Sequence, residues 1–297
     1  MDRSPQDMPL RLAAFQWLEA QCRIHDDVLP RKLLELGFPF RGERITLVGQ
    51  TGIWKPRQMQ LPISITTTIH SPYSDTPGDQ YIGYSYRGTD PGHRDNVGLR
   101  ICMQKQIPLI YFYAVMPGKY LASWPTYIIE DDIRKLTFTA AVDEARVAFN
   151  QSVQEDEEAY IRRGYITSNV KVRIHQKTFR ERVLYAYQTQ CALCRLKHRE
   201  LLDAAHIIAD SQEKGDPLVS NGLSLCKIHH AAFDQNIIGI TPDYTIKIRQ
   251  DILEETDGPM LKYGIQSLEN HRLILPQHKK DWPDRERLEQ RFGEFLR

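Results

Sequence analysis

The sequence predicts an α+β protein of two domains, and three features of the chain lead to that prediction. Residues 8–36 show the apolar spacing of a helix, interrupted at Pro30 and ending at Gly37. Residues 44–130 contain short runs of β-branched and aromatic residues separated by Pro and Gly, which favour a sheet or a barrel. Three of the five cysteines fall within 36 positions of the last third. The length of 297 residues suits two ordinary domains or one large domain.

The composition excludes several classes of protein. Hydrophobic residues make up 41% of the chain and aromatic residues 9%, which is enough for a packed core, so wholesale disorder is not expected. No apolar run approaches the ~18 residues that a membrane span needs. The first residues lack a cationic segment followed by an apolar core, so we expect a cytoplasmic protein without membrane partners. An odd number of cysteines argues against a disulfide framework.

The chain also predicts the individual elements in outline. The expected strands of the first domain are residues 45–48, 63–69, 81–86, 107–115 and 126–129. Residues 136–160 are expected to form a connecting helix. The expected elements of the last third are a strand over 201–208, a helix over 227–234, a hairpin over 237–249 and a terminal helix over 282–296.

Basic residues are concentrated in one part of a nearly neutral chain. The formal net charge is +1, yet residues 161–199 contain ten Lys and Arg and a single acid, Glu181. Such a segment suits nucleic acid, because neutralised phosphates release counterions. The alternative is an ordinary solvated basic helix. Our candidates for DNA contact are Arg180, Arg182 and Lys197, together with Arg94 in a loop of the first domain.

Two pairs of metal-binding residue types follow this basic segment. Cys191 and Cys194 form a CxxC motif, and Cys226 and His229 form a second pair with the same two-residue spacer. Two such knuckles match a tetrahedral structural zinc site. A redox CxxC motif would not require the second pair, and two unrelated pairs remain the other alternative.

Between and after the knuckles, the expected order is strand, loop and helix. His206 lies on the strand and Asn221 in the loop, whereas His230 and Asp234 share one face of the helix at a spacing of four. This arrangement can hold a hard divalent cation beside a general base.

The segment CALC…LDAAHI…NGLSLCKIHHAAFD resembles the HNH, or ββα-metal, nuclease motif of the subtype with a zinc knuckle, over about residues 191–240. The resemblance implies metal-dependent hydrolysis of phosphodiester bonds. His206 matches the general base, Asn221 the residue that orients this base, and His230 the first metal ligand on the helix. Asp234 stands where many members have a second His.

One position departs from the family pattern. Many members carry a metal ligand immediately before the base, and here that position is Ala205. Side chains of a strand alternate, so Asp203 shares the face of Ala205 and is our candidate for the missing ligand. A set of Asp203, Asp234 and His230 suits Mg²⁺ or Mn²⁺ better than zinc.

The first domain contains an aromatic strand, a Gly-rich loop and an apolar strand, over residues 78–99 and 107–129. This order resembles the SRA fold, a PUA-like β-barrel that flips a modified cytosine into an aromatic pocket, and the likeness spans about 42–135. The expected layout is therefore an SRA-like domain over 1–140, a helical linker over 141–175 and an HNH domain over 176–297.

A flipped base is held by aromatic stacking and by hydrogen bonds to its edge. Tyr84 and Tyr86 are our stacking candidates, because they share one face of the expected strand. Asp79 or Asp90 could accept a hydrogen bond from the base, and Trp54 could line the rim. The alternative is that these tyrosines simply pack the barrel.

Together these features predict a bacterial restriction endonuclease of the type IV class that cuts DNA containing 5-methylcytosine or 5-hydroxymethylcytosine. One HNH site cuts one strand, so a homodimer is expected. Two alternatives remain open: a nuclease whose barrel senses another modification or a ligand, and a zinc-containing DNA reader without catalytic activity.

Overall fold

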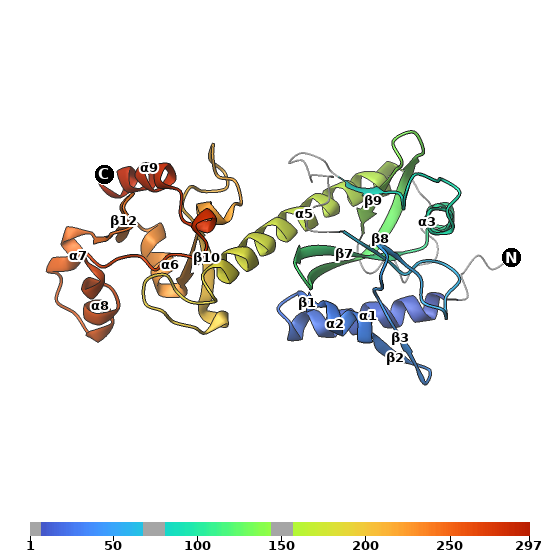
Figure 1. Ribbon diagram of the computed structural model, residues 1–297, viewed down its shortest axis with the longest axis horizontal. Helices are drawn as coiled ribbons and strands as arrows, with labels where there is room; N and C mark the ends of the chain where they lie inside the picture. Colours follow the sequence, from blue (N-terminus) through green and yellow to red (C-terminus); the bar gives the residue numbers. More distant parts are fainter. Residues whose placement is uncertain (1–6, 68–80, 144–156) are drawn as a thin grey trace. The chain divides into compact units, whose positions relative to one another are not determined.

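The computed structural model describes residues 7–67, 81–143 and 157–297 (Figure 1). The chain divides into two compact units, which we call unit 1 (Met1–Ile174) and unit 2 (His175–Arg297). Helix α5 (Glu157–Ala186) supplies residues to both units. Within these ranges, no helix combines the length and the apolar character that crossing a bilayer requires.

Unit 1 contains a seven-stranded sheet with the strand order β4-β5-β7-β8-β9-β6, in which β1 also pairs with β8. Its strands are β1 (Val28–Pro30), β4 (Ile53–Trp54), β5 (Ser64–Thr66), β6 (Ile82–Ser85), β7 (Leu109–Met116), β8 (Lys119–Asp132) and β9 (Thr137–Val142). Strands β5 and β7 are parallel, and the other neighbours are antiparallel. A separate hairpin joins β2 (Phe38–Phe40) and β3 (Glu43–Ile45).

The sheet curls into a half-barrel. The 14-residue strand β8 pairs with β7 and β9 through registers that shift, and such irregularities bend strands. The two ends of the strand order approach each other, because the Tyr84 hydroxyl on β6 donates a hydrogen bond of 3.3 Å to the carbonyl oxygen of Thr66 on β5. The α+β fold class is therefore confirmed, whereas closure into a full PUA- or SRA-like barrel stays a prediction.

Strand β7 is buried on both faces, which explains its uninterrupted apolar sequence. Ile110 and Phe112 face the core cluster that contains buried residues of α1 (Met8–Ile24) and α2 (Arg31–Leu36). Leu109 and Tyr111 face the second core cluster, to which α3 (Arg94–Gln104) contributes. The alternation of period 2 thus places one strand between two cores.

Helix α3 replaces part of the loop that the sequence predicted. The His93 side chain caps the helix by accepting a hydrogen bond of 3.2 Å from the Asp95 amide. Asn96 is fully buried and holds the preceding turn: its Oδ1 accepts from the Arg87 amide at 2.8 Å, and its Nδ2 donates to the carbonyl oxygens of Arg87 and Asp90. The Pro and Gly residues of the segment conceal this helix start in the sequence.

The predicted helix over residues 136–160 is wrong at its beginning. Residues 137–142 form β9, which pairs with both β8 and β6. Phe138, Ala140 and Val142 are buried at alternate positions of this strand. Two alanines gave the segment a helical character that pairing within the sheet overrides. Residues 144–156 lie outside the described ranges.

Unit 2 contains two antiparallel hairpins and several short helices. Its elements after α5 are η1 (Arg199–Leu201), β10 (Leu202–His206), η2 (Val219–Asn221), β11 (Gly222–Cys226), α6 (Lys227–Asp234), β12 (Ile238–Ile240), β13 (Ile246–Ile248), α7 (Gln250–Glu254), α8 (Pro259–Gly264), η3 (Gln266–Leu268), η4 (Lys279–Asp281) and α9 (Arg285–Phe295). The predicted strand, central helix, second hairpin and terminal helix of this region are confirmed.

Replacing Asn96 with Ala is expected to destabilise unit 1 by about 2 kcal/mol, because burial of backbone groups without partners is costly. Urea unfolding followed by fluorescence measures this, since three of the four tryptophans lie in unit 1. Asn169, an exposed residue of helix α5, provides the matched Asn→Ala control. A variant that unfolds at the wild-type urea concentration would show that Asn96 does not hold this turn.

Candidate active site and metal centre

Four side chains of unit 2 form a compact cluster of metal-ligand types. One ligand atom from each of Cys191, Cys194, Cys226 and His229 lies within 4.8 Å of the others. Nδ1 of His229 is 3.4 Å from Sγ of Cys191 and 3.2 Å from Sγ of Cys226. The neighbouring thiols hold the pKa of the Cys226 thiol well below its usual value, which favours the thiolate. Three thiols and one imidazole at these distances fit a structural zinc ion.

Backbone contacts hold the cluster in place. Nε2 of His229 donates a hydrogen bond of 2.7 Å to the carbonyl oxygen of Gly264, which leaves Nδ1 as the atom that can bind a metal. The Ala192 amide donates to the Ser224 carbonyl oxygen at 2.7 Å, so the first knuckle is attached to β11. The four predicted zinc ligands thus lie together, and backbone hydrogen bonds hold the cluster in place.

The hairpin of β10 and β11 leads directly into α6. Asp203 pairs with Leu225 and His206 with Gly222 in the antiparallel register. Cys226 ends β11, and His229 lies in the first turn of α6. The cluster therefore fixes the start of the helix that carries His230 and Asp234.

His206 ends β10 and lies flat against Phe179 of α5. Burial lowers the pKa of His206, and the charge of His230 lowers it further, while Asp210 and Asp234 oppose this effect. Nε2 of His206 is buried without a hydrogen-bond partner. Nδ1 of the same ring has no hydrogen bond within the described residues and is not buried. A neutral imidazole with one open nitrogen can act as a general base.

Asn221 lies in the last position of η2 and is fully buried. Its Oδ1 accepts a hydrogen bond of 2.9 Å from the Ile208 amide, and its Nδ2 donates to the carbonyl oxygens of Ile208 and Asp216. The Asn221 carbonyl oxygen accepts from the Ile207 amide. Asn221 therefore fixes the chain immediately after His206 through backbone groups of residues 207 and 208.

His230 lies between the two carboxylates that were predicted to bind the catalytic metal. Its Nδ1 is 3.7 Å from Asp203 and its Nε2 is 3.3 Å from Asp234. One ring nitrogen binds one ion, so in this arrangement only one carboxylate can share an ion with His230. Asp234 is the more exposed of the two, with 54% of its side chain accessible against 25% for Asp203.

Asp203 is occupied by other partners. Its carboxylate accepts a hydrogen bond of 2.6 Å from Lys227 and lies 3.6 Å from Arg180. Burial raises the pKa of Asp203, but Lys227, His230 and Arg180 outweigh burial and hold the pKa below its usual value. Asp203 is thus a charged group that Lys227 and Arg180 hold near Nδ1 of His230. Ala205, two residues further along β10, is buried and has no ligand atom.

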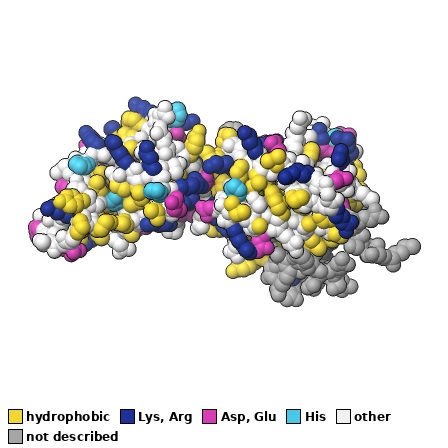
Figure 2. All heavy atoms as spheres, turned by 90° about the horizontal axis from the view of Figure 1, so that it is seen from below, with side chains coloured by type: hydrophobic (Ala, Val, Ile, Leu, Met, Phe, Trp, Pro, Cys, Tyr) yellow, Lys and Arg dark blue, Asp and Glu magenta, His cyan; other side chains and the backbone are white. Residues whose placement is uncertain are grey.

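Much of the basic segment is used inside the protein. At least five of its ten cations contact acids or carbonyl oxygens: Arg162, Arg163, Lys171, Arg180 and Arg199. Arg180 contacts Asp203 and donates to the Leu202 carbonyl oxygen at 2.9 Å. Lys197 and Arg94 are exposed, and Arg182 is half-buried. On the face that Figure 2 shows, Asp and Glu side chains lie among the Lys and Arg side chains.

The predicted stacking residues line a cavity of unit 1 of about 420 Å³. Tyr84 and Tyr86 form part of its wall, and both rings are largely buried. The Tyr86 hydroxyl hydrogen-bonds with Asp131 and accepts from Arg100. The cavity lies where the ends of the curled sheet meet, between residues 50–53, the end of β5 and β6.

Other predicted pocket residues lie elsewhere. Trp54 packs in the α1 core and donates hydrogen bonds to Thr46, and it does not line the cavity. The Asp90 carboxylate accepts a hydrogen bond from the Gly92 amide in an exposed turn. Asp79 lies outside the described residues. The sequence interpretation missed Thr66, whose Oγ1 is buried without a partner at this cavity.

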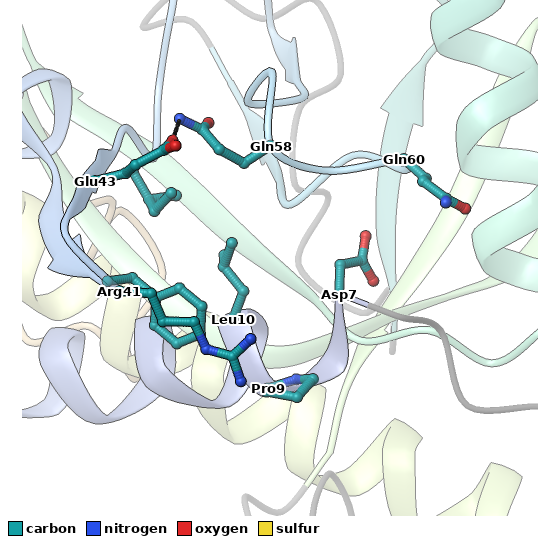
Figure 3. A pocket seen from close by; sticks show the side chains of 9 residues that line it. Asp7, Pro9, Leu10, Arg41, Glu43, Gln58 and Gln60 are labelled. Carbon is teal, nitrogen blue, oxygen red and sulfur yellow. Dashed lines mark hydrogen bonds between the residues drawn. The ribbon is translucent and has the colours of Figure 1, made fainter.

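A second hollow of unit 1, of about 340 Å³, lies beside the start of α1 (Figure 3). Glu43 accepts a hydrogen bond of 2.7 Å from Gln58 across one side. Asp7 on the other side pairs with buried Arg11 at 3.3 Å. None of the described residues that we predicted to contact DNA or a base lines this hollow.

Comparison with known proteins identifies one segment of unit 2. Residues 191–241 match a family model described as HNH endonuclease, and this segment contains the metal cluster, His206, Asn221, His230 and Asp234. The chain is a metal-dependent DNA endonuclease. Among solved structures, the protein described as "Modification dependent TagI restriction endonuclease" matches with 16% identity and a TM-score of 0.30, over 82% of this chain and 85% of that chain. No curated protein matches the chain.

Replacing Cys226 with Ala is expected to abolish zinc binding, because three ligands remain from a tetrahedral set. Elemental analysis should then show loss of the ~1 zinc per chain that a four-ligand site holds. Cys102→Ala is the matched control, since this buried cysteine lies in the other unit. Equal zinc contents in both variants would exclude the cluster as the zinc site.

Proposed function

We propose that this chain is a modification-dependent restriction endonuclease of the type IV class. Unit 1 recognises 5-methylcytosine or 5-hydroxymethylcytosine flipped out of DNA, and unit 2 hydrolyses a phosphodiester bond nearby with Mg²⁺ or Mn²⁺. The observation that carries the proposal is the grouping of His206, His230 and Asp234 on one hairpin and helix anchored by the zinc-ligand cluster.

His206 is the general base in this proposal. Its low pKa keeps the ring neutral near pH 7, so that Nδ1 can take a proton from the attacking water. Asn221 holds the backbone that follows His206, and Lys227 and Arg180 hold Asp203 against His230.

His230, through Nε2, and Asp234 would hold the catalytic cation, whereas Asp203 lies at Nδ1 and would hold the His230 ring rather than the ion. An imidazole and carboxylates suit Mg²⁺ or Mn²⁺. When bound, such an ion supplies positive charge to the scissile phosphate and to the leaving oxygen.

The cavity at the sheet ends supports the role of unit 1. A flipped base needs a rigid wall and polar groups at its edge. Tyr84 and Tyr86 supply the wall, because their hydroxyl groups are already held by neighbours. The buried Thr66 hydroxyl has no partner among residues 7–67, 81–143 and 157–297 and would bind the base edge.

A double-strand break needs two cuts, and each chain carries one HNH motif. We therefore propose that two copies act together as a homodimer on DNA.

Replacing His206 with Ala is expected to lower the cleavage rate about 10²- to 10⁴-fold, the usual contribution of a general base. DNA binding should persist, because the imidazole holds the water rather than the DNA. Plasmid nicking and a gel-shift assay measure the two properties, and exposed His271 offers the matched His→Ala control. Wild-type cleavage by H206A would remove His206 from the mechanism.

Plasmids that are unmodified, 5-methylcytosine-containing or 5-hydroxymethylcytosine-containing separate the functions of the two units. We expect cutting of modified DNA only, with Mg²⁺ or Mn²⁺, and none with EDTA. Thr66→Val should reduce cleavage of modified DNA about tenfold through the loss of one hydrogen bond. Thr139→Val, whose hydroxyl instead contacts Glu130, should retain wild-type cleavage.

Cutting of all three plasmids would support the nuclease activity of unit 2 but reject the recognition of modified cytosine by unit 1. Cutting of none with either metal would favour a DNA reader or a sensor of another modification.

A further inference from the structure

The closest aromatic pair among the described residues joins the proposed base to helix α5. The ring centroids of Phe179 and His206 are 3.9 Å apart and the rings are inclined by 15°. The other ring pairs identified in the described ranges are 4.5–6.5 Å apart. Phe179 is 3% exposed, so its ring forms a fixed surface behind the imidazole.

Gly222 provides the space for this contact. It lies opposite His206 in the hairpin, with an extended backbone that any residue could adopt. A Cβ at this position would lie 2.4 Å from Cγ2 of Val183 and 2.9 Å from Cζ of Phe179. A side chain at residue 222 would therefore push Phe179 away from His206.

The stack matters because no hydrogen bond orients the His206 ring within the described structure. A catalytic histidine is usually oriented by a hydrogen bond to its second nitrogen. Here Nε2 is buried and has no partner, so packing alone determines the ring plane. For Nδ1 to accept a proton, the neutral His206 ring must carry its hydrogen on the buried Nε2.

We propose that Phe179 is a positioning residue of the nuclease site, which holds the His206 ring so that Nδ1 faces the attacking water. The proposal rests on the proposed role of His206 as general base. The next residue of α5, Arg180, holds Asp203 on the same strand. One turn of α5 thus supports both polar residues that β10 contributes to the site.

The test compares Phe179→Leu, which retains an apolar side chain without a flat face, with Val183→Ala. Val183 packs over Gly222 from the same helix, so its truncation controls for lost packing. Single-turnover cleavage of a 5-methylcytosine plasmid at saturating protein measures the chemical step, and a gel-shift assay measures DNA affinity. Thermal melting establishes that each variant is folded. If F179L does not fold, Phe179→Met takes its place in the comparison.

We expect F179L to cleave about 10- to 100-fold more slowly, the cost of a misplaced catalytic group, with unchanged DNA affinity. Exposure of the ring should raise the pKa of His206, so the acid limb of the rate profile moves to higher pH. Asp210, His230 and Asp234 face the ring in all variants and supply the same charges. V183A should retain both the rate and the profile.

An F179L or F179M variant with the wild-type rate and profile would overturn the role of Phe179, provided that H206A is inactive in the same assay. Equal losses in V183A and F179L would also overturn it, because packing in general would then explain the effect. Full activity of H206A would instead reject the proposed function itself.

Discussion

The contacts within the Cys191, Cys194, Cys226 and His229 cluster determine the geometry of unit 2. Two of these ligands flank the junction where β11 ends and α6 begins, so a bound ion would fix the direction of the helix relative to the hairpin. The hydrogen bond from His229 to Gly264 extends this constraint to α8. A helix of eight residues has little stability alone, and the cluster supplies the anchor that its length cannot.

The composition of the basic segment indicates contact with nucleic acid, but several of its cations instead neutralise carboxylates inside the protein. Buried Asp143 pairs with Arg162 and Arg163, and buried Glu181 pairs with Arg199, so these cations compensate interior carboxylates. Burial of an unpaired carboxylate would be far more costly than burial of a paired one. The cations that stay exposed, such as Lys197, are therefore the better candidates for contact with DNA phosphates.

The sequence predicts best where the determining contacts are short in range. The ligand pairs, the helix over 227–234 and the order of strand, loop and helix depend on spacings of two to four residues, and the structure contains them. Helix α3 was missed because the hydrogen bonds of Asn96 that hold its start span six to nine residues, beyond the spacings that the sequence patterns cover. Strand β9 was missed because its pairing with β6 joins segments that are far apart in the sequence. Phe179 is 27 positions from His206, and no local pattern predicts their stack.

The two halves of the proposed catalytic site have separate supports. His230 and Asp234 belong to α6, which depends on the zinc-ligand cluster. His206 and Asp203 belong to β10, which depends on Phe179 and Arg180 of α5 and on Asn221. Because β10 and β11 are hydrogen-bonded neighbours, the supports meet in one hairpin. A change in either support is therefore expected to displace the proposed base from the proposed metal ligands, so that substitutions on α5 can slow catalysis without contacting DNA or metal.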